Sequence, residues 1–201
     1  MRITLIAGLL LAFTCGALVQ MPESAPAAQT AVLASNGPVV ADYARTGYPN
    51  TPEGRIAKEV RHELLMLPYY SLFDDLEYSV QGRTVRLSGV VTADHSITKS
   101  EAEAAVKRIE GVDKVINDIK ILPPSPLDQQ AREKVYRAIA NTGSLSRYFW
   151  EAAPSIHIIV DNQRVTLKGY VNSEMDKNMA TIAASGVPDV FKVTNELRVV
   201  K

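Results

Sequence analysis

Three histidines and one cysteine are the side chains in this 201-residue chain best suited to metal binding or nucleophilic chemistry. His62, His95 and His157 are scattered, with no partner three or four residues away and no carboxylate cluster at a ligand spacing. The pattern predicts neither a zinc site nor a Ser-His-Asp arrangement. A glycine-rich phosphate loop is also missing from the sequence. We therefore expect no enzyme activity, no cofactor and no metal ion.

Aromatic and cationic side chains gather at two equivalent places and indicate surface contact instead. Neighbouring aromatic residues cannot both point inward, so at least one ring in each group is expected at the surface. Nearby cations would attract anionic headgroups by about 1 kcal/mol each. Packing of the rings against a small core, or of one copy on the other, is the alternative, with the cations on a solvated helix face. The candidate contact residues are Tyr69, Tyr70, Arg132, Lys134, Arg137, Arg147, Tyr148, Phe149 and Trp150.

The overall charge is balanced, with 22 Lys and Arg against 22 Asp and Glu. A chain without net charge has no bulk electric field to concentrate nucleic acid. We therefore expect no nucleic-acid partner.

The N-terminus has the pattern of an export signal. Arg2 precedes an apolar run at 3–13 that is too short to span a bilayer comfortably. We predict a signal peptide at 1–27 and a flexible leader at 28–53, with a membrane anchor as the alternative. Cys15, the single cysteine, lies in this segment, and the bulky Phe13 before it disfavours lipidation.

The rest of the chain contains an internal repeat. The segment 80–91 returns at 160–171, 80 positions later, and the segment 115–121 returns at 193–199, offset by 78. Repetition at this length predicts two copies of one small domain. We place the copies at 54–122 and 128–201, joined by a stiff Pro-rich linker at 123–127.

Each copy reads as helix, strand, strand, helix, strand. In the first, an apolar stripe that starts at Ile56 ends before Pro68, and Gly82 separates two alternating strands. A helix capped by Asp94 or Ser96 follows, and a third strand covers 115–121.

The second copy repeats this order. A helix near 128–140 is followed by strands at 156–160 and 164–171. A helix at 173–185 is expected to turn Met175, Met179 and Ile182 inward, and the last strand covers 191–200. The predicted fold class is α+β, with each three-stranded sheet covered on one face by two helices. The bare face is available for a partner or for the other copy.

The two copies share the run Val-x-Leu-x-Gly-x-Val, a helix, and then Gly-Val and Val-x-Asn-x-Leu or Ile. This pattern resembles the BON domain, named for osmotically inducible protein Y and nodulation proteins. The second copy departs from it at 188–192, where the connection is about two residues longer. The matching residues are Val85, Leu87, Gly89, Val91, Gly111, Val112, Val115, Asn117 and Ile119, and then Val165, Leu167, Gly169, Val171, Gly186, Val187, Val193, Asn195 and Leu197.

The resemblance implies export to the bacterial periplasm, with association with the outer membrane left open. It also implies a role in envelope integrity or osmotic stress, through binding of phospholipid surfaces or envelope proteins, and no catalysis or cofactor. A soluble periplasmic chaperone that holds unfolded clients on its bare sheet faces is the alternative function. An assembly scaffold is a third hypothesis.

Two kinds of shared position are expected to serve structure. Gly89 and Gly169 lie inside strands, where glycine marks a bulge or a close backbone approach. Asn117 and Asn195 are expected to bond nearby backbone. His157 alternates with core positions, so it should point to the far face of its sheet.

Overall fold

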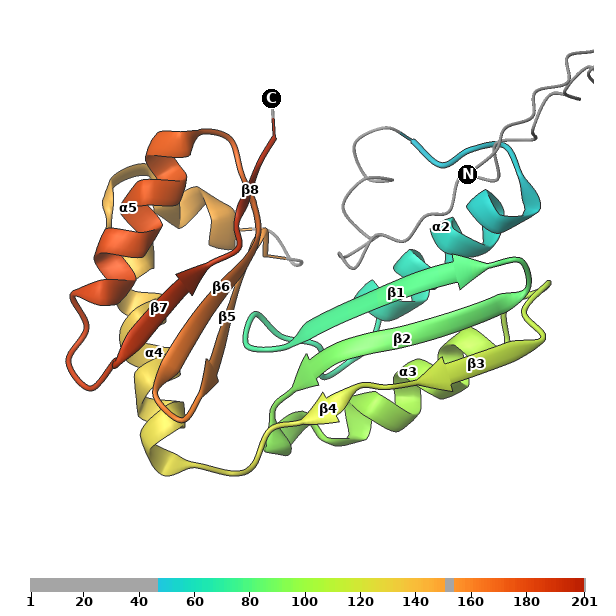
Figure 1. Ribbon diagram of the computed structural model, residues 1–201, viewed down its shortest axis with the longest axis horizontal. Helices are drawn as coiled ribbons and strands as arrows, with labels where there is room; N and C mark the ends of the chain where they lie inside the picture. Colours follow the sequence, from blue (N-terminus) through green and yellow to red (C-terminus); the bar gives the residue numbers. More distant parts are fainter. Residues whose placement is uncertain (1–46, 151–153, 201) are drawn as a thin grey trace, which may run out of the picture. The chain divides into compact units, whose positions relative to one another are not determined.

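A computed structural model describes residues 47–150 and 154–200 of the chain. The predicted signal peptide, most of the leader and Cys15 lie outside these residues. The described part is α+β and contains two successive domains with the same element order (Figure 1). The first domain comprises α2 (Pro52–Leu65), β1 (Asp75–Gln81), β2 (Thr84–Val91), a 3-10 turn (Ala93–His95), α3 (Ile97–Lys107), β3 (Lys114–Asn117) and β4 (Lys120–Ile121). The second comprises α4 (Pro126–Ala140), a 3-10 segment (Gly143–Phe149), β5 (Ile156–Asp161), β6 (Arg164–Val171), α5 (Glu174–Ser185), β7 (Lys192–Asn195) and β8 (Arg198–Val199).

The first helix of each domain starts earlier than the sequence suggested, because a hydroxyl caps it. The amide of Gly54 donates to Thr51 Oγ1 over 3.1 Å, and the amide of Asp128 donates to Ser125 Oγ over 3.2 Å. Proline follows each cap, where its missing N–H costs nothing. Helix α4 therefore begins at Pro126, inside the segment predicted as linker.

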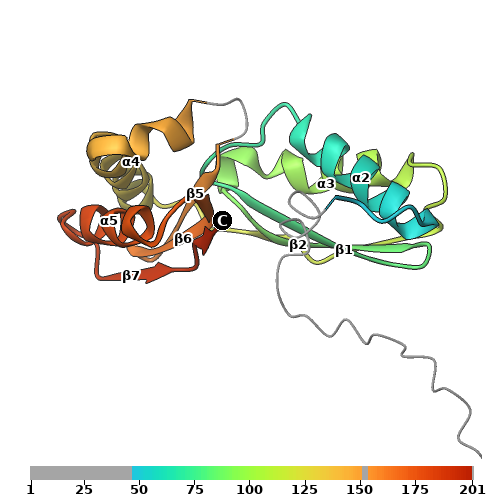
Figure 2. The ribbon, with the colours of Figure 1, turned by 90° about the horizontal axis from the view of Figure 1, so that it is seen from above.

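The long strand of each hairpin is the centre of its sheet. β2 pairs antiparallel with β1 and parallel with both β3 and β4, and β6 pairs in the same way with β5, β7 and β8. Two helices cover one face of each sheet (Figure 2), as predicted. The third strand was predicted as continuous, but two short strands share its place.

An asparagine breaks this third strand in both domains. Asn117 accepts the amide of Ile119 on Oδ1 over 3.2 Å, and its Nδ2 donates to the carbonyl of Lys99 on α3 over 2.8 Å. Asn195 repeats the arrangement toward Lys177. The side chain thus replaces a missing ladder bond and ties the strand to the covering helix, which confirms its predicted structural role.

Replacing Asn195 with alanine is expected to lower the stability of the second domain by about 2 kcal/mol. The change leaves the Leu197 amide and the Lys177 carbonyl without the bonds of 2.9 and 2.8 Å that Asn195 provides. Urea denaturation followed by signals of the second domain measures the loss. Asn178→Ala, an exposed site on the same α5, is the control and should change stability by under about 0.5 kcal/mol. Equal effects of the two variants would contradict the bridging role.

The longer connection of the second domain does not shift its last strand. Val165 pairs with Val193 as Val85 pairs with Val115 in the first domain. The connection includes Asp189, whose φ of 71° is left-handed. The extra residues are therefore absorbed in the loop, and the strand register is the same in both copies.

Each domain has its own apolar core between its helices and its sheet. In α3, Ala102, Ala105 and Val106 are buried. In α5, Met175 and Ile182 were wrongly expected to point inward, since they are 71% and 72% exposed, whereas Met179 packs against the core as predicted. The buried residues of α5 are Asp176, Ala180 and Ala184, one helical turn apart. Small side chains on this face let the helix approach its neighbours closely.

Candidate functional site

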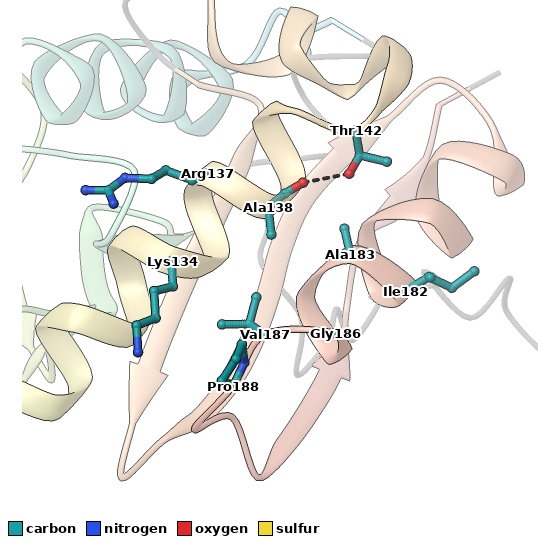
Figure 3. A pocket seen from close by; sticks show the side chains of 9 residues that line it. All are labelled: Lys134, Arg137, Ala138, Thr142, Ile182, Ala183, Gly186, Val187 and Pro188. Carbon is teal, nitrogen blue, oxygen red and sulfur yellow. Dashed lines mark hydrogen bonds between the residues drawn. The ribbon is translucent and has the colours of Figure 1, made fainter.

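A groove of about 480 Å³ lies between α4 and α5 on the helical side of the second domain (Figure 3). Its charged lining residues are Lys134 and Arg137, both from α4. Small and apolar side chains lie between the helices, while the charged ends of the two cations extend away from them (Figure 3). The remaining lining residues are Ala138, Thr142, Ile182, Ala183, Gly186, Val187 and Pro188. The site is an apolar groove with a cationic rim.

Each rim cation takes part in an exposed ion pair. Lys134 Nζ lies 2.9 Å from Asp189 Oδ2, and Arg137 Nη2 lies 3.0 Å from Glu133 Oε2. Exposed pairs of this kind contribute about 0–1 kcal/mol and are screened by salt. An anionic partner can therefore replace Asp189 or Glu133 at little cost.

Arg132 was predicted to join these cations, and the structure corrects that prediction. Its residue is 3% exposed, and its Nη2 donates to the carbonyl of Val160 over 2.9 Å. Asp128, one turn before it, accepts the amides of Asn162 and Gln163 at the β5–β6 turn. Arg132 and Asp128 on this side of α4 are thus hydrogen-bonded to the β5–β6 hairpin, so Arg132 cannot reach a membrane or a partner.

The aromatic segment that follows α4, 148–150, likewise contains both buried and exposed side chains. Tyr148 is buried and donates to Asp176, and Arg147 donates to the same carboxylate over 2.8 Å. Phe149 packs edge-on against Tyr136, with ring centroids 5.2 Å apart. Trp150 alone is free, at 79% exposure. Of this predicted cluster, therefore, one ring is available at the surface.

Asp176 is a buried structural residue that the sequence analysis missed. Besides Arg147 and Tyr148, it accepts hydrogen bonds from Ser144 over 3.1 Å and from Ser173 over 2.7 Å. The local signal was present in the sequence, because Ser173 caps α5 and an acidic residue three positions later is common at helix starts. The convergence of Arg147 and Ser144 on it could not be read from spacing.

The equivalent aromatic pair of the first domain also separates. Tyr69 is half-exposed, whereas Tyr70 stacks on His157 with centroids 5.5 Å apart. His157 lies on the face of β5 opposite the core residues Ile156 and Ile158, as predicted. The far face of the second sheet is thus partly covered by the first domain, with which it shares one compact unit.

The first domain has a corresponding groove between α2 and α3, of about 970 Å³. Its lining mixes both charges: the cations Arg55, Lys58, Arg83 and Arg108 lie with the carboxylates of Glu59, Glu63 and Glu110. Carboxylates in the lining would repel an anionic partner. The second-domain groove, lined by cations alone among charged residues, is the better anion site.

Other kinds of site are not found in the described residues. Within 47–150 and 154–200, no cluster of three or more His, Cys, Asp or Glu has a geometry that could hold a metal ion. In the same residues, no helix has the length and apolar character that a bilayer crossing needs.

A family model for the BON domain matches the chain twice, at 52–123 and 127–201. None of the curated proteins matches it. Among solved structures, the C-terminal domain of CdsD, a structural protein of the type III secretion system of Chlamydia trachomatis, is 13% identical, with a TM-score of 0.29. The match covers 72% of this chain and 96% of that one. A second CdsD structure is 14% identical over 73% of this chain and 92% of that one, also with a TM-score of 0.29.

Proposed function

This chain belongs to the BON domain family, of which it carries two copies, and we propose on that basis that it is a non-enzymatic envelope protein that binds phospholipid or membrane-protein surfaces. The family is generally without enzymatic activity. The present chain is accordingly a binding protein without catalytic activity, and its second domain has the main binding role.

The observation that carries the proposal is the α4–α5 groove. Its rim has two exposed cations, Lys134 and Arg137, and its lining is otherwise apolar or uncharged. An anionic amphiphile offers the matching chemistry, a negative headgroup beside an apolar chain. Ile182 at the groove is 72% exposed, so it can enter the apolar region of a bilayer. Trp150, which is also exposed, suits the interface between headgroups and chains.

The tandem arrangement supports binding to an extended surface. Two modules that each bind weakly gain affinity when they are joined, because the second binding event becomes intramolecular. Contacts between the two domains restrict how far they can separate. A surface that engages the second domain therefore keeps the first domain close.

The compartment is part of the proposal. The apolar run at 3–13 behind Arg2 supports export by a signal peptide at 1–27. We propose a periplasmic location, where a role in osmotic stress would be exerted at the envelope. Mass spectrometry of the mature N-terminus tests this, since an uncleaved Met1 would contradict export by signal cleavage.

Vesicle flotation tests the binding site. Wild-type protein is expected to float with vesicles that contain phosphatidylglycerol and to stay behind with neutral phosphatidylcholine. Lys134→Gln with Arg137→Gln removes about 2 kcal/mol of attraction, so binding should fall about 30-fold. Trp150→Ser should weaken it by about tenfold.

The control is Arg55→Gln with Lys58→Gln, which removes the same charge from the mixed groove of the first domain. It should leave flotation unchanged. Equal losses in both double variants would mean that net charge, rather than the second-domain groove, drives binding. If neither the wild-type protein nor any variant floats with the vesicles, and the protein suppresses aggregation of an unfolded client, the chaperone alternative is favoured.

A further inference from the structure

One segment of the first domain lies along the outer edge of the second sheet. β5 is an edge strand, with β6 as its neighbour in the sheet. The amide of Ile158 on its outer side donates to the carbonyl of Leu72 over 2.8 Å. Leu72 and Phe73 also pack against the second core. The first domain thus pairs with an edge that would otherwise present free backbone groups.

His157 is the side chain at the centre of this contact. Its Nδ1 lies 2.7 Å from the carbonyl oxygen of Asp74, so that nitrogen must carry a hydrogen and donate it. Its ring stacks on Tyr70, and its Nε2 lies 3.5 Å from the Tyr70 hydroxyl. A neutral imidazole with the hydrogen on Nδ1 satisfies both neighbours. A second proton would have to sit on Nε2, beside a hydroxyl enclosed in the same contact.

Charged groups surround this ring from several elements. Lys168, which pairs with His157 across β5 and β6, lies 2.7 Å from Asp75 Oδ2 and 2.8 Å from Glu77 Oε1 on β1. The Asp74 carboxylate points elsewhere, toward His95, Ser71 and Thr92. Arg61 lies near enough to Tyr70 to act on its hydroxyl electrostatically. The titratable or charged residues around the His157 ring are therefore Tyr70, Asp74, Asp75, Glu77, His95, Lys168 and Arg61, although the Asp74 carboxylate itself points away from the ring.

Burial is the largest influence on His157, and it lowers the pKa of the imidazole, although the charges of Asp75 and Asp74 and hydrogen bonds to the backbone of Asp74 and Ser71 oppose it. For Lys168, burial acts to lower the pKa, but Asp75 and Glu77 outweigh it and raise the pKa above its usual value. Lys168 thus stays charged over the physiological range. His157 is the histidine whose ring lies inside the contact between the two domains, and histidine is the side chain that ordinarily changes charge near neutral pH.

We propose that the contact between the two domains is an acid-opened latch, closed while His157 is neutral and released when it becomes protonated. With the domains apart, His157 is hydrated and has the ordinary histidine pKa of about 6.5. The closed state binds fewer protons than the open state below that pH. Closure is therefore unaffected well above about pH 6.5 and weakens as the pH falls below it.

Opening would change what the protein can bind. It frees the outer amide of Ile158 on β5 and the apolar side chains of Leu72 and Phe73 that now pack on the second core. An unpaired strand edge beside apolar side chains accepts an extended peptide by adding it as a strand. The inference does not depend on the lipid proposal, because the α4–α5 groove has no residue in this contact.

Residual dipolar couplings of the full chain test the latch at about pH 7.5 and about pH 5, on either side of the histidine pKa. In the wild type, one alignment tensor should fit both domains at the higher pH and two separate tensors should be needed at the lower pH. His157→Asn keeps an amide donor near the position of Nδ1 without a titrating ring, so it should need one tensor at both values. His62→Asn, at an exposed histidine on α2, should behave as wild type.

A single tensor at both pH values in the wild type, or separate tensors at the higher pH, would overturn the proposal. If His157→Asn opens the contact at both pH values, the proposal is tested on the wild-type chain by following the ring signals of His157 as the pH changes. Ring signals of His157 should then titrate below the ordinary histidine value of about 6.5, in step with the loss of the shared tensor. Separation of the domains without protonation of His157 would refute the latch.

Discussion

Gly169→Ala is expected to destabilise the second domain by at least about 3 kcal/mol, which is a large fraction of the total stability of a small domain. Gly169 has a φ of +111°, a left-handed value that side chains rarely adopt. A Cβ there would lie 2.0 Å from the backbone oxygen of Ser155, which also accepts the amide of Tyr170 over 2.8 Å. The obstacle is a backbone atom directly before β5, so it cannot rotate away as the end of a side chain could.

Calorimetry or urea denaturation followed by signals of each domain measures the effect. Gly89→Ala is the equivalent change in the first domain, where the Cβ would lie 2.1 Å from the oxygen of Asp75. Gly82→Ala is the control, since Gly82 has a φ of +59° but no atom within 4 Å of an added Cβ. It should cost only about 1 kcal/mol of left-handed strain. A loss in Gly169→Ala no larger than in Gly82→Ala would show that the sheet yields.

Asp176→Ala is expected to cost roughly 3 kcal/mol, the second large effect. The carboxylate receives Tyr148, Arg147 and two serines, and its removal leaves the buried Tyr148 hydroxyl without its acceptor. The 3-10 segment would lose its tie to α5. Trp150 follows that segment directly, so vesicle binding should weaken as well.

The same carboxylate gives the second domain a specific acid sensitivity. Burial acts to raise the pKa of Asp176, but the hydrogen bonds from Ser173, Tyr148 and Ser144 and the charge of Arg147 together lower it below its ordinary value. A lowered carboxylate pKa stabilises the folded state above the ordinary value of about 3.9. That contribution is lost as the pH falls below it. Asp176→Asn should therefore flatten the stability curve of the second domain in this range.

Glu174→Ala is the matched control. Glu174 is exposed in the first turn of the same helix, and its replacement also removes one negative charge there. It should cost under about 1 kcal/mol, mainly through the helix dipole. If both variants lose the same stability, the effect of Asp176 would be helix capping charge alone rather than the buried network.

The α+β order of both domains followed from sequence because it depends on local and repeated signals. Strand β6 has the predicted bounds, Arg164–Val171. Gly89, Gly169, Asn117 and Asn195 have the structural roles that their positions indicated. Each of these roles depends on backbone conformation or on atoms brought near by one hairpin or one strand-helix pair, so a short stretch of sequence contains the necessary information.

Helix α5 shows where pattern alone misled. Its large apolar residues Met175 and Ile182 suggested the inward face, yet Asp176, Ala180 and Ala184 are buried. A hydrophobic pattern ranks residues by size and polarity. Where a helix packs closely, however, only small side chains fit at the contact. A carboxylate can also be buried there when several hydrogen-bond donors surround it.

The candidate contact residues show the same limit. Arg132 and Lys134 are two positions apart on α4, so they point in different directions, and one braces β5 while the other lies at the groove. Tyr148 and Trp150 are equally close, with one buried and the other free. Which side of each pair meets the core depends on where the sheet and α5 lie, and the local sequence does not contain that information.

The sequence by itself determined the duplication, the order of helices and strands, and the glycine and asparagine positions that the hairpins and split strands require. The tertiary structure decided which cations are free, which aromatic rings are buried, and that His157 meets Tyr70 and Asp74. The physical reason is range: conformational preferences act over a few residues, whereas burial and ion pairing join residues such as Lys168 and Asp75 that only folding brings within 2.7 Å.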